Sequence, residues 1–335
     1  MTRTRTTVVL TALLTTAIVA ATLAGARGQQ NPADRAGNAG ALTVLPVQGA
    51  ITLITNPEGN VVVQTGKDGV LVVDSPPAAF VPQMLAEIRK LTPLPLRFII
   101  NTSIDPARWG GNVALLGLPS GRGTGGAPFA SVGAGDRPAI LAHDAVLNRM
   151  AQLSPPAPPA AQPTNTYFLP SMDFHSNGEA VILFHRPAAF SDSDTIVHFR
   201  RSDVIAAGNI FTPARYPVID LERGGSVAGL VSALGFILEL AVPEAFEDGG
   251  TRIIPAVGRV SEETDVAEYR DMIAIIRDRI QDGIRKKMTL EQITASKPSR
   301  DYDGEYNASQ ADADRFVETM YRSLTATSAR PGERP

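Results

Sequence analysis

Short apolar runs alternate with turn-forming sequences over the first part of the chain. Three runs rich in β-favouring residues lie at Ala50–Thr55, Asn60–Thr65 and Val70–Asp74. Turns containing Gly, Asp and Asn separate them, which is the pattern of consecutive antiparallel strands. Apolar residues then recur with helical spacing over Ala78–Leu91, and a further strand is predicted at Leu96–Asn101. This strand–helix–strand order indicates the beginning of a layered α/β fold.

The second half of the chain repeats this style. A short strand and a helix are predicted first, at Ala139–Ala142 and His143–Gln152. Later strands are predicted at Glu179–Phe184, Thr195–Phe199, Val204–Ala207 and Arg252–Pro255. Helices are predicted from Ser226 to about Ala241, from Ser261 to about Lys287, and over Ala311–Leu324. Two sheet-plus-helix halves favour an α/β protein built as a four-layer αββα sandwich.

Two segments lack this periodicity. Residues 117–138 are rich in Gly, Ser and Pro and are expected to form a long loop. The Gly-rich run 121–126 in this loop lacks the Gly-Lys-Ser/Thr ending of a phosphate-binding loop, so a flexible loop is the better interpretation. Ser154–Pro163 is rich in Pro and Ala and is expected to be an extended surface connector. It is either a domain boundary or, as we favour, an internal crossover.

The N-terminal residues have the features of a targeting segment. Arg3 and Arg5 precede an apolar run from Val8 to Leu23, and the small residues Ala24-Gly25-Ala26 follow. This order predicts a secretory signal peptide over residues 1–26, with an uncleaved membrane anchor as the alternative. A flexible leader over 27–41, a main domain over 42–290 and a helical tail over 291–335 complete the predicted organisation.

The composition of the chain limits the kinds of site that it can form. The chain has 335 residues, a formal net charge of -3 and no cysteine. The absence of cysteine excludes disulfides, thiolate metal ligands and a cysteine nucleophile. The charge gives no reason to expect a nucleic-acid partner. Histidine is scarce, with only His143, His175, His185 and His198. We expect His143 to begin a helix, His175 to lie in a polar turn, and the other two to lie on or beside strands.

Several short motifs, taken in order, are similar to those of the metallo-β-lactamase superfamily. They are Gly59–Val63, Asp68–Ser75, Arg97–Thr102, Gly110–Asn112, Ala142–Val146, Asp192–Val197, Asp203–Gly208 and Ile253–Pro255. The resemblance runs from about residue 48 to about residue 287. The tail, with Asp301–Asp303 and Phe316–Glu318, also resembles that of certain exported members. The resemblance implies the αββα sandwich and a cleft that holds two zinc ions in active members.

The resemblance also shows which positions would bind zinc. In the family these positions carry histidines and carboxylates, which hold the ions that activate a water for hydrolysis. In this chain the seven matching positions hold Ser103, Asp105, Ala107, Arg108, Phe190, Asn209 and Val257. All seven differ from the family pattern.

The replacements are poor zinc ligands. Arg108 brings a fixed positive charge that repels a dication, and Phe190 and Val257 offer no lone pair. Asp105 and Asn209 still offer oxygen atoms. We therefore expect no zinc, no other cofactor and no catalytic residue of the family's kind. The former zinc cleft is the candidate binding site, lined by Asp74, Ser103, Asp105, Arg108, Phe190, Asn209 and Val257.

The same residues allow other interpretations. Asp105 and Arg108 form an ion pair in place of the metal, or both are solvated loop charges. Asp74, Asp192 and Asp194 gather as a hard-cation site or, as we favour, cap turns and helices. Ser103 has no histidine close in sequence, so a serine nucleophile needs a base from elsewhere in the fold. Trp109 is expected to pack beside the cleft.

Three functions remain open at this point. The first is an exported, non-catalytic pseudo-hydrolase that binds a small molecule or an exported protein. The second is a residual or altered hydrolase for an ester, thioester or lactam bond, with another metal or none. The third is a structural subunit that pairs with an active relative. The signal peptide predicts a periplasmic or secreted protein with no membrane span after its removal.

Overall fold

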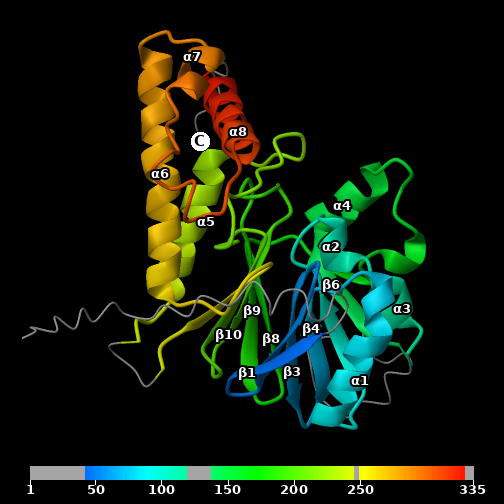
Figure 1. The fold of residues 1–335 in the computed structure, drawn as a ribbon. Coiled ribbons are helices and arrows are strands. Elements are labelled where there is room, and N and C mark those ends of the chain that lie inside the picture. The colour runs from blue at the N-terminus through cyan, green and yellow to red at the C-terminus, as the bar shows by residue number, and fades with distance from the viewer. Residues whose placement is uncertain (1–41, 119–136, 245–248, 329–335) are drawn as a thin grey trace, which may run out of the picture. The chain divides into compact units, whose positions relative to one another are not determined.

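Two β-sheets face each other, and helices cover the outer face of each, in a computed structural model that describes residues 42–118, 137–244 and 249–328 (Figure 1). The first sheet contains, in spatial order, β1 (Thr43–Gln48), β2 (Ile51–Asn56), β3 (Gly59–Gly66), β4 (Gly69–Val73), β5 (Leu96–Ile100), β6 (Ala139–His143) and β7 (Asn165–Tyr167). The second contains β12 (Arg252–Pro255), β11 (Val204–Gly208), β10 (Thr195–Phe199), β9 (Glu179–His185) and β8 (Ser171–Ser176).

Both sheets change from antiparallel to parallel pairing, and helical crossovers explain why. Strands β1 to β4 pair antiparallel through short turns, whereas β4 to β7 pair parallel. Helix α1 (Val81–Leu91) connects β4 to β5, and α4 (Asp144–Gln152) lies between β6 and β7. In the second sheet only β11 and β12 are parallel, and α5 (Val227–Leu240) joins them. A parallel pair needs such a long connection.

Alternating side chains of β4 show how the layers are held together. Leu71 and Val73 point into the apolar cluster between the two sheets, which also contains Phe199 of β10. Val70 and Val72 point the other way, into a second cluster that includes Met84 of α1. Strand residues alternate between two faces, so a strand buried on both sides is apolar throughout.

A third apolar cluster covers the outer face of the second sheet. Ile205 and Ile253 from the sheet join Leu230 of α5, Ile273 of α6 (Glu263–Arg285) and Phe316 of α8 (Gln310–Ser328). Figure 1 shows α5, α6 and α8 on this side and α1 with α3 (Asn112–Leu116) on the other. Shorter helices are α2 (Pro106–Trp109) and α7 (Leu290–Ala295). The predicted four-layer αββα sandwich is confirmed.

Several local predictions are confirmed and a few are wrong. The strands Thr195–Phe199 and Arg252–Pro255 have the predicted bounds, and Ser226 caps α5 by accepting from Gly229 N. The Pro-rich segment lies in the crossover between β6 and β7, as favoured. The edge strands β1, β7 and β8 were not predicted. His175 was expected in a polar turn, but it lies on β8, where exposed and buried positions alternate.

Some predictions fall outside the described residues. The signal segment, the leader 27–41, the Gly-rich run 121–126 and most of the predicted loop belong to this group.

Among the described residues, no helix has the length and apolar character required to cross a membrane.

A buried carboxylate joins the two sheets. Glu179 of β9 accepts hydrogen bonds from Gln64 of β3 at 2.7 Å and from the Ser202 hydroxyl at 2.8 Å. The backbone N–H groups of Arg201 and Ser202 donate to its other oxygen. Each donor would lose a charged acceptor if the carboxylate were removed.

We therefore expect Glu179→Ala to lower the free energy of unfolding by about 3 kcal/mol, because several buried donors would be left without an acceptor. Urea denaturation of both proteins measures this. Asp173→Ala removes an exposed carboxylate from the neighbouring strand β8 and should change stability by less than about 0.5 kcal/mol. Equal effects of the two substitutions would contradict the structural role of Glu179.

Candidate functional site

The ends of the parallel strands bring the candidate residues to one edge of the sandwich. Asp74 follows β4, Ser103 lies shortly after β5, and Asn209 follows β11. Ala256 follows β12 at the same edge, since its N–H donates to Gly208 O. In open α/β sheets, ligands bind outside the carboxyl ends of such strands. The fold thus gathers at one edge residues that are far apart in the sequence.

Asp74 is a buried carboxylate that organises the residues after β5. It is 4% exposed and adopts a left-handed backbone conformation, with φ of 64°. Its oxygens accept from Thr102 N at 2.8 Å and from the Thr102 hydroxyl at 2.9 Å. Burial raises the pKa of the Asp74 carboxyl to about 6, while the nearby Arg108 charge and the Thr102 hydrogen bonds oppose this rise.

Arg108 places a guanidinium inside the site. It belongs to α2 and is 2% exposed. Nη2 donates to Glu58 O at 2.9 Å, Nη1 donates to Ala256 O at 3.2 Å, and Nη1 lies 3.8 Å from Asp74 Oδ2. The side chain therefore links the β2–β3 turn, the end of β12 and the end of β4. The proposed ion pair between Arg108 and Asp105 is wrong, because the carboxylate beside Arg108 is that of Asp74.

The turn before β3 leaves room for this guanidinium only because of a glycine. Gly59 has a φ of 142°, and a Cβ built at this position would lie 2.7 Å from Arg108 Nη2. A side chain at residue 59 would therefore clash with the guanidinium and strain the backbone. Gly59 and Arg108 fit each other as a pair.

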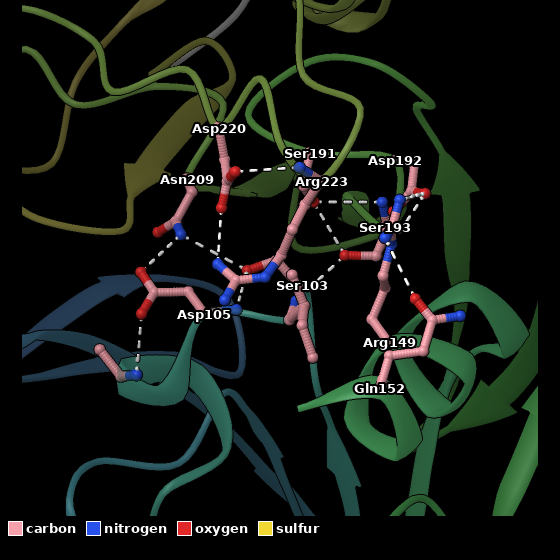
Figure 2. Close-up of polar contacts among 12 residues, drawn as sticks. Ser103, Asp105, Arg149, Gln152, Ser191, Asp192, Ser193, Asn209, Asp220 and Arg223 are labelled. Atoms are coloured by element: carbon pink, nitrogen blue, oxygen red, sulfur yellow. Dashed lines mark hydrogen bonds and ion pairs between the residues drawn. The ribbon is translucent and has the colours of Figure 1, made fainter. Parts of the chain in front are cut away.

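Asp105 and Asn209 meet at the opening of the site. Asp105 caps α2 by accepting from Ala107 N at 3.0 Å. Its other oxygen accepts from Asn209 Nδ2 at 2.7 Å, and Asn209 Nδ2 lies 3.4 Å from the buried Ser103 hydroxyl. Figure 2 shows Asp105 and Asn209 pointing toward each other. Among the described residues, the Ser103 hydroxyl accepts from Asp105 N and Asn209 Nδ2, and neither group can act as a base.

A pocket of about 190 Å³ opens beside this pair. Its lining residues are Asp105, Pro106, Phe190, Asn209, Thr212, Arg215, Val218 and Arg223. Of the seven sequence-predicted binding residues, three are among them. Ser103 and Arg108 are buried and do not line the pocket. Ser103 contacts Asp105 and Asn209, and Arg108 lies beside Asp74. Val257 is half-buried and does not line the pocket; its neighbour Ala256 instead accepts from Arg108.

The pocket residues that follow Asn209 were not among the binding residues predicted from the sequence. Thr212, Arg215, Val218 and Arg223 all lie between β11 and α5. Loops after the carboxyl ends of strands commonly carry binding residues, and this rule alone could have pointed to the segment. Arg223 donates from Nη1 to Asp220 at 2.6 Å, as Figure 2 shows.

The other wall of the site is a loop held by its own carboxylates. Asp192 forms a bidentate pair with Arg149 of α4, whose Nη2 donates to Oδ2 at 2.6 Å and whose Nε donates to Oδ1 at 3.2 Å. Asp194 is buried and accepts from Ser191 N at 2.7 Å. Burial raises the pKa of the Asp194 carboxyl well above its usual value. Figure 2 shows this loop beside Arg149 and Gln152.

The suggested hard-cation site of three aspartates does not form. Asp74 lies beside Arg108, Asp192 pairs with Arg149, and Asp194 caps the turn of its own loop. Within the part of the chain that the structure describes, no group of three or more His, Asp or Glu residues is placed to hold a metal. The guanidinium of Arg108, the ring of Phe190 and the carboxylate–amide pair of Asp105 and Asn209 occupy the site. This set of side chains does not fit a zinc centre.

Two of the four histidines, His143 and His185, have structural roles at the ends of β6 and β9. His143 begins α4 as predicted, by accepting from Ala145 N at 3.2 Å. Its ring stacks on that of His185, with centroids 3.5 Å apart. Burial, together with the His143 ring, lowers the pKa of His185 to about 4. The indole of Trp109 donates to Ile104 O and packs beside the site, as predicted.

No protein-family model matches the chain, and no curated protein matches it. Several solved structures match the chain. A metallo-β-lactamase from Pontibacter korlensis matches with a TM-score of 0.54 and 10% identity, over 70% of this chain and 99% of that one. The DIM-1 metallo-β-lactamase matches with a TM-score of 0.51 and 13% identity, over 70% and 97%.

The stereoselective inverting sec-alkylsulfatase Pisa1 from Pseudomonas sp. also matches. Its TM-score is 0.59 and its identity 15%, over 87% of this chain and 52% of that one. This chain thus spans about half the length of the alkylsulfatase. At such low identities the likeness concerns the fold. The protein has the metallo-β-lactamase fold.

Proposed function

We propose that this protein is a non-catalytic pseudo-hydrolase that binds a small molecule in the pocket beside Asp105 and Asn209. The observation that carries the proposal is the buried guanidinium of Arg108. It lies at the strand ends where the family resemblance expects a zinc ligand, and three groups hold it in place. A fixed cation at this position repels a metal ion and offers it no lone pair.

The pocket retains groups that can bind a ligand. Phe190, Pro106 and Val218 offer apolar surface. Asn209 donates to Asp105 through its amide nitrogen, which leaves the amide oxygen as an acceptor. Small-molecule sites combine apolar surface with polar groups that fix the orientation of the ligand, and the lining of this pocket offers both. Binding thus requires no metal.

Metal content tests this proposal. After dialysis against trace zinc, we expect the purified protein to contain close to zero equivalents of zinc by elemental mass spectrometry, because Arg108 opposes a dication. A zinc-dependent metallo-β-lactamase dialysed alongside serves as the positive control. One or two equivalents of zinc would contradict the proposal, and loss of that zinc in Asp105→Ala would place it beside Asp105. A residual hydrolase would then be the better account.

Removal of the guanidinium tests its structural role. We expect Arg108→Met to lower the free energy of unfolding by about 3 kcal/mol at pH 8, because Asp74 would stay buried without its cation. The loss should be smaller at pH 5. The folded pKa of Asp74, about 6, exceeds its ordinary value of 3.8. Protonation of Asp74 therefore adds to the free energy of unfolding. This contribution is complete below about pH 4 and is lost as the pH rises through 6.

Without Arg108 the pKa of Asp74 rises further, so the variant should keep losing stability above pH 6. Urea denaturation at the two pH values measures this. Arg200→Met makes the same charge change at an exposed position and should show neither effect. An Arg108→Met loss that is equal at pH 5 and pH 8 would contradict the coupling to Asp74.

We also propose that residues 1–26 direct export to the periplasm or beyond and are then removed. The positive N-terminus, the apolar run and the small residues at 24–26 support this. Expression of the full sequence in a bacterial host should give an intact mass that lacks this segment. A mass that retains it would instead favour an uncleaved anchor.

A further inference from the structure

A second and larger cavity, of about 310 Å³, lies between the segment 215–219 and the C-terminal part of the chain. One wall is formed by residues that follow β11, and the other by Tyr306 and residues of α8. Its volume falls in the range of small-molecule sites, roughly 300 to 1,000 Å³. The pocket beside Asp105 is smaller, about 190 Å³.

An aromatic stack supports this cavity. The Tyr216 ring lies between those of Phe316 and Tyr306, with centroid distances of 4.6 and 5.4 Å. The Tyr216 hydroxyl already donates to Asp303 at 2.7 Å. All three rings are at least 94% buried, since Tyr216 and Tyr306 are 6% exposed and Phe316 is 4% exposed. The stack therefore gives the cavity a fixed, mainly apolar base.

Two arginines from opposite walls lie at the cavity. Arg215 is exposed, and among the described residues no ion pair is found for it. Its backbone is held, because its N–H donates to Thr212 O and its carbonyl accepts from Tyr269. Arg315 of α8 pairs with Asp312 at 3.2 Å, but both side chains are at least half exposed. Such a pair contributes little and can be exchanged for a ligand.

The lining of the cavity also exposes apolar surface to solvent. Val218 is 54% exposed, and it lies beside Pro217 in the lining of the cavity. A ligand that covers Val218 would remove apolar surface from water, which favours binding. The two arginines and the single carboxylate of Asp312 leave the lining with a net positive charge.

We propose that this cavity is a second ligand site, which binds a small amphipathic carboxylate. The carboxylate group contacts Arg215 and Arg315, and the hydrocarbon part covers Val218, Pro217 and the edge of Phe316. Arginine is well suited to bind carboxylates through two parallel hydrogen bonds. The inference goes beyond the proposed function and stands without it, since it requires nothing of Asp105, Asn209 or Arg108.

Arg215 and Val218 also line the pocket beside Asp105, so variants must separate the two sites. Arg315 and Thr319 line only the second cavity, and Arg223 lines only the first. Arg322 is exposed on the same helix as Arg315 and lines neither. These positions supply matched substitutions for each site.

Octanoate titration by calorimetry is the experiment. We expect the wild-type protein to bind octanoate, and to bind the neutral octanamide and the cationic octylamine at least tenfold more weakly. Arg315→Glu should weaken octanoate binding at least tenfold, and Thr319→Trp should abolish it by filling the cavity. Arg322→Glu makes the same charge change and should leave binding unchanged, as should Arg223→Ala.

Three results would overturn the proposal. They are no octanoate binding up to its solubility limit, binding that survives Arg315→Glu, and octylamine binding as tightly as octanoate. If only Arg223→Ala weakened octanoate binding, the ligand would be assigned to the pocket beside Asp105 instead. Arg315 is exposed on α8, so its variant remains informative if Thr319→Trp fails to fold.

Discussion

The guanidinium of Arg108 is buried at the edge of the sandwich, and the geometry of the candidate site depends on how its charge is accommodated. Two backbone carbonyls accept from it and the Asp74 carboxylate lies 3.8 Å away. A buried charge is tolerated only when such partners surround it. Because the partners come from the β2–β3 turn and the ends of β4 and β12, the same side chain that disfavours a metal also ties three parts of the edge together.

The other charged side chains of the site are also held by protein groups. Interactions among ordinary side chains hold its carboxylates: Asp105 with Asn209, Asp192 with Arg149, and Asp194 with the backbone of Ser191. Of these three carboxylates, only that of Asp105 stands at one of the seven positions where the family resemblance expects a zinc ligand. Separate apolar clusters hold the layers together, with one between the two sheets and one beneath the helices on each outer face. The fold can therefore persist while the chemistry of its edge changes.

Much of the fold could be predicted from the sequence, because buried strands and amphipathic helices leave strong periodic signals. The central strands and α5 were predicted close to their observed bounds. The edge strand β1 was missed because most of its residues are exposed or half-buried and carry no clear apolar alternation. At the site, the family resemblance located Asp105, Phe190 and Asn209 at one pocket. It could not show that Arg108 reaches Asp74 rather than Asp105, because that pairing depends on where the strands end in space.

The positions of Arg215 and Val218 at two cavities could not be predicted from the sequence, for a related reason. Their importance comes from two cavities on which they border, one beside Asp105 and one against α8. The residues that complete the second cavity lie about 90 positions further along the chain, from Tyr306 to Thr319. No local pattern links the two segments, and only the packing of α8 into the third apolar cluster brings them together.

We infer that Arg108 occupies the place that a metal ion has in zinc-binding proteins of this fold. The most direct measurement is a crystal structure of the protein grown with excess zinc, with anomalous diffraction data collected at the zinc absorption edge. We expect no anomalous peak near Asp74 or Asp105, with Arg108 still donating hydrogen bonds to the carbonyls of Glu58 and Ala256. A zinc peak coordinated by these carboxylates, with the Arg108 side chain turned out to solvent, would contradict it.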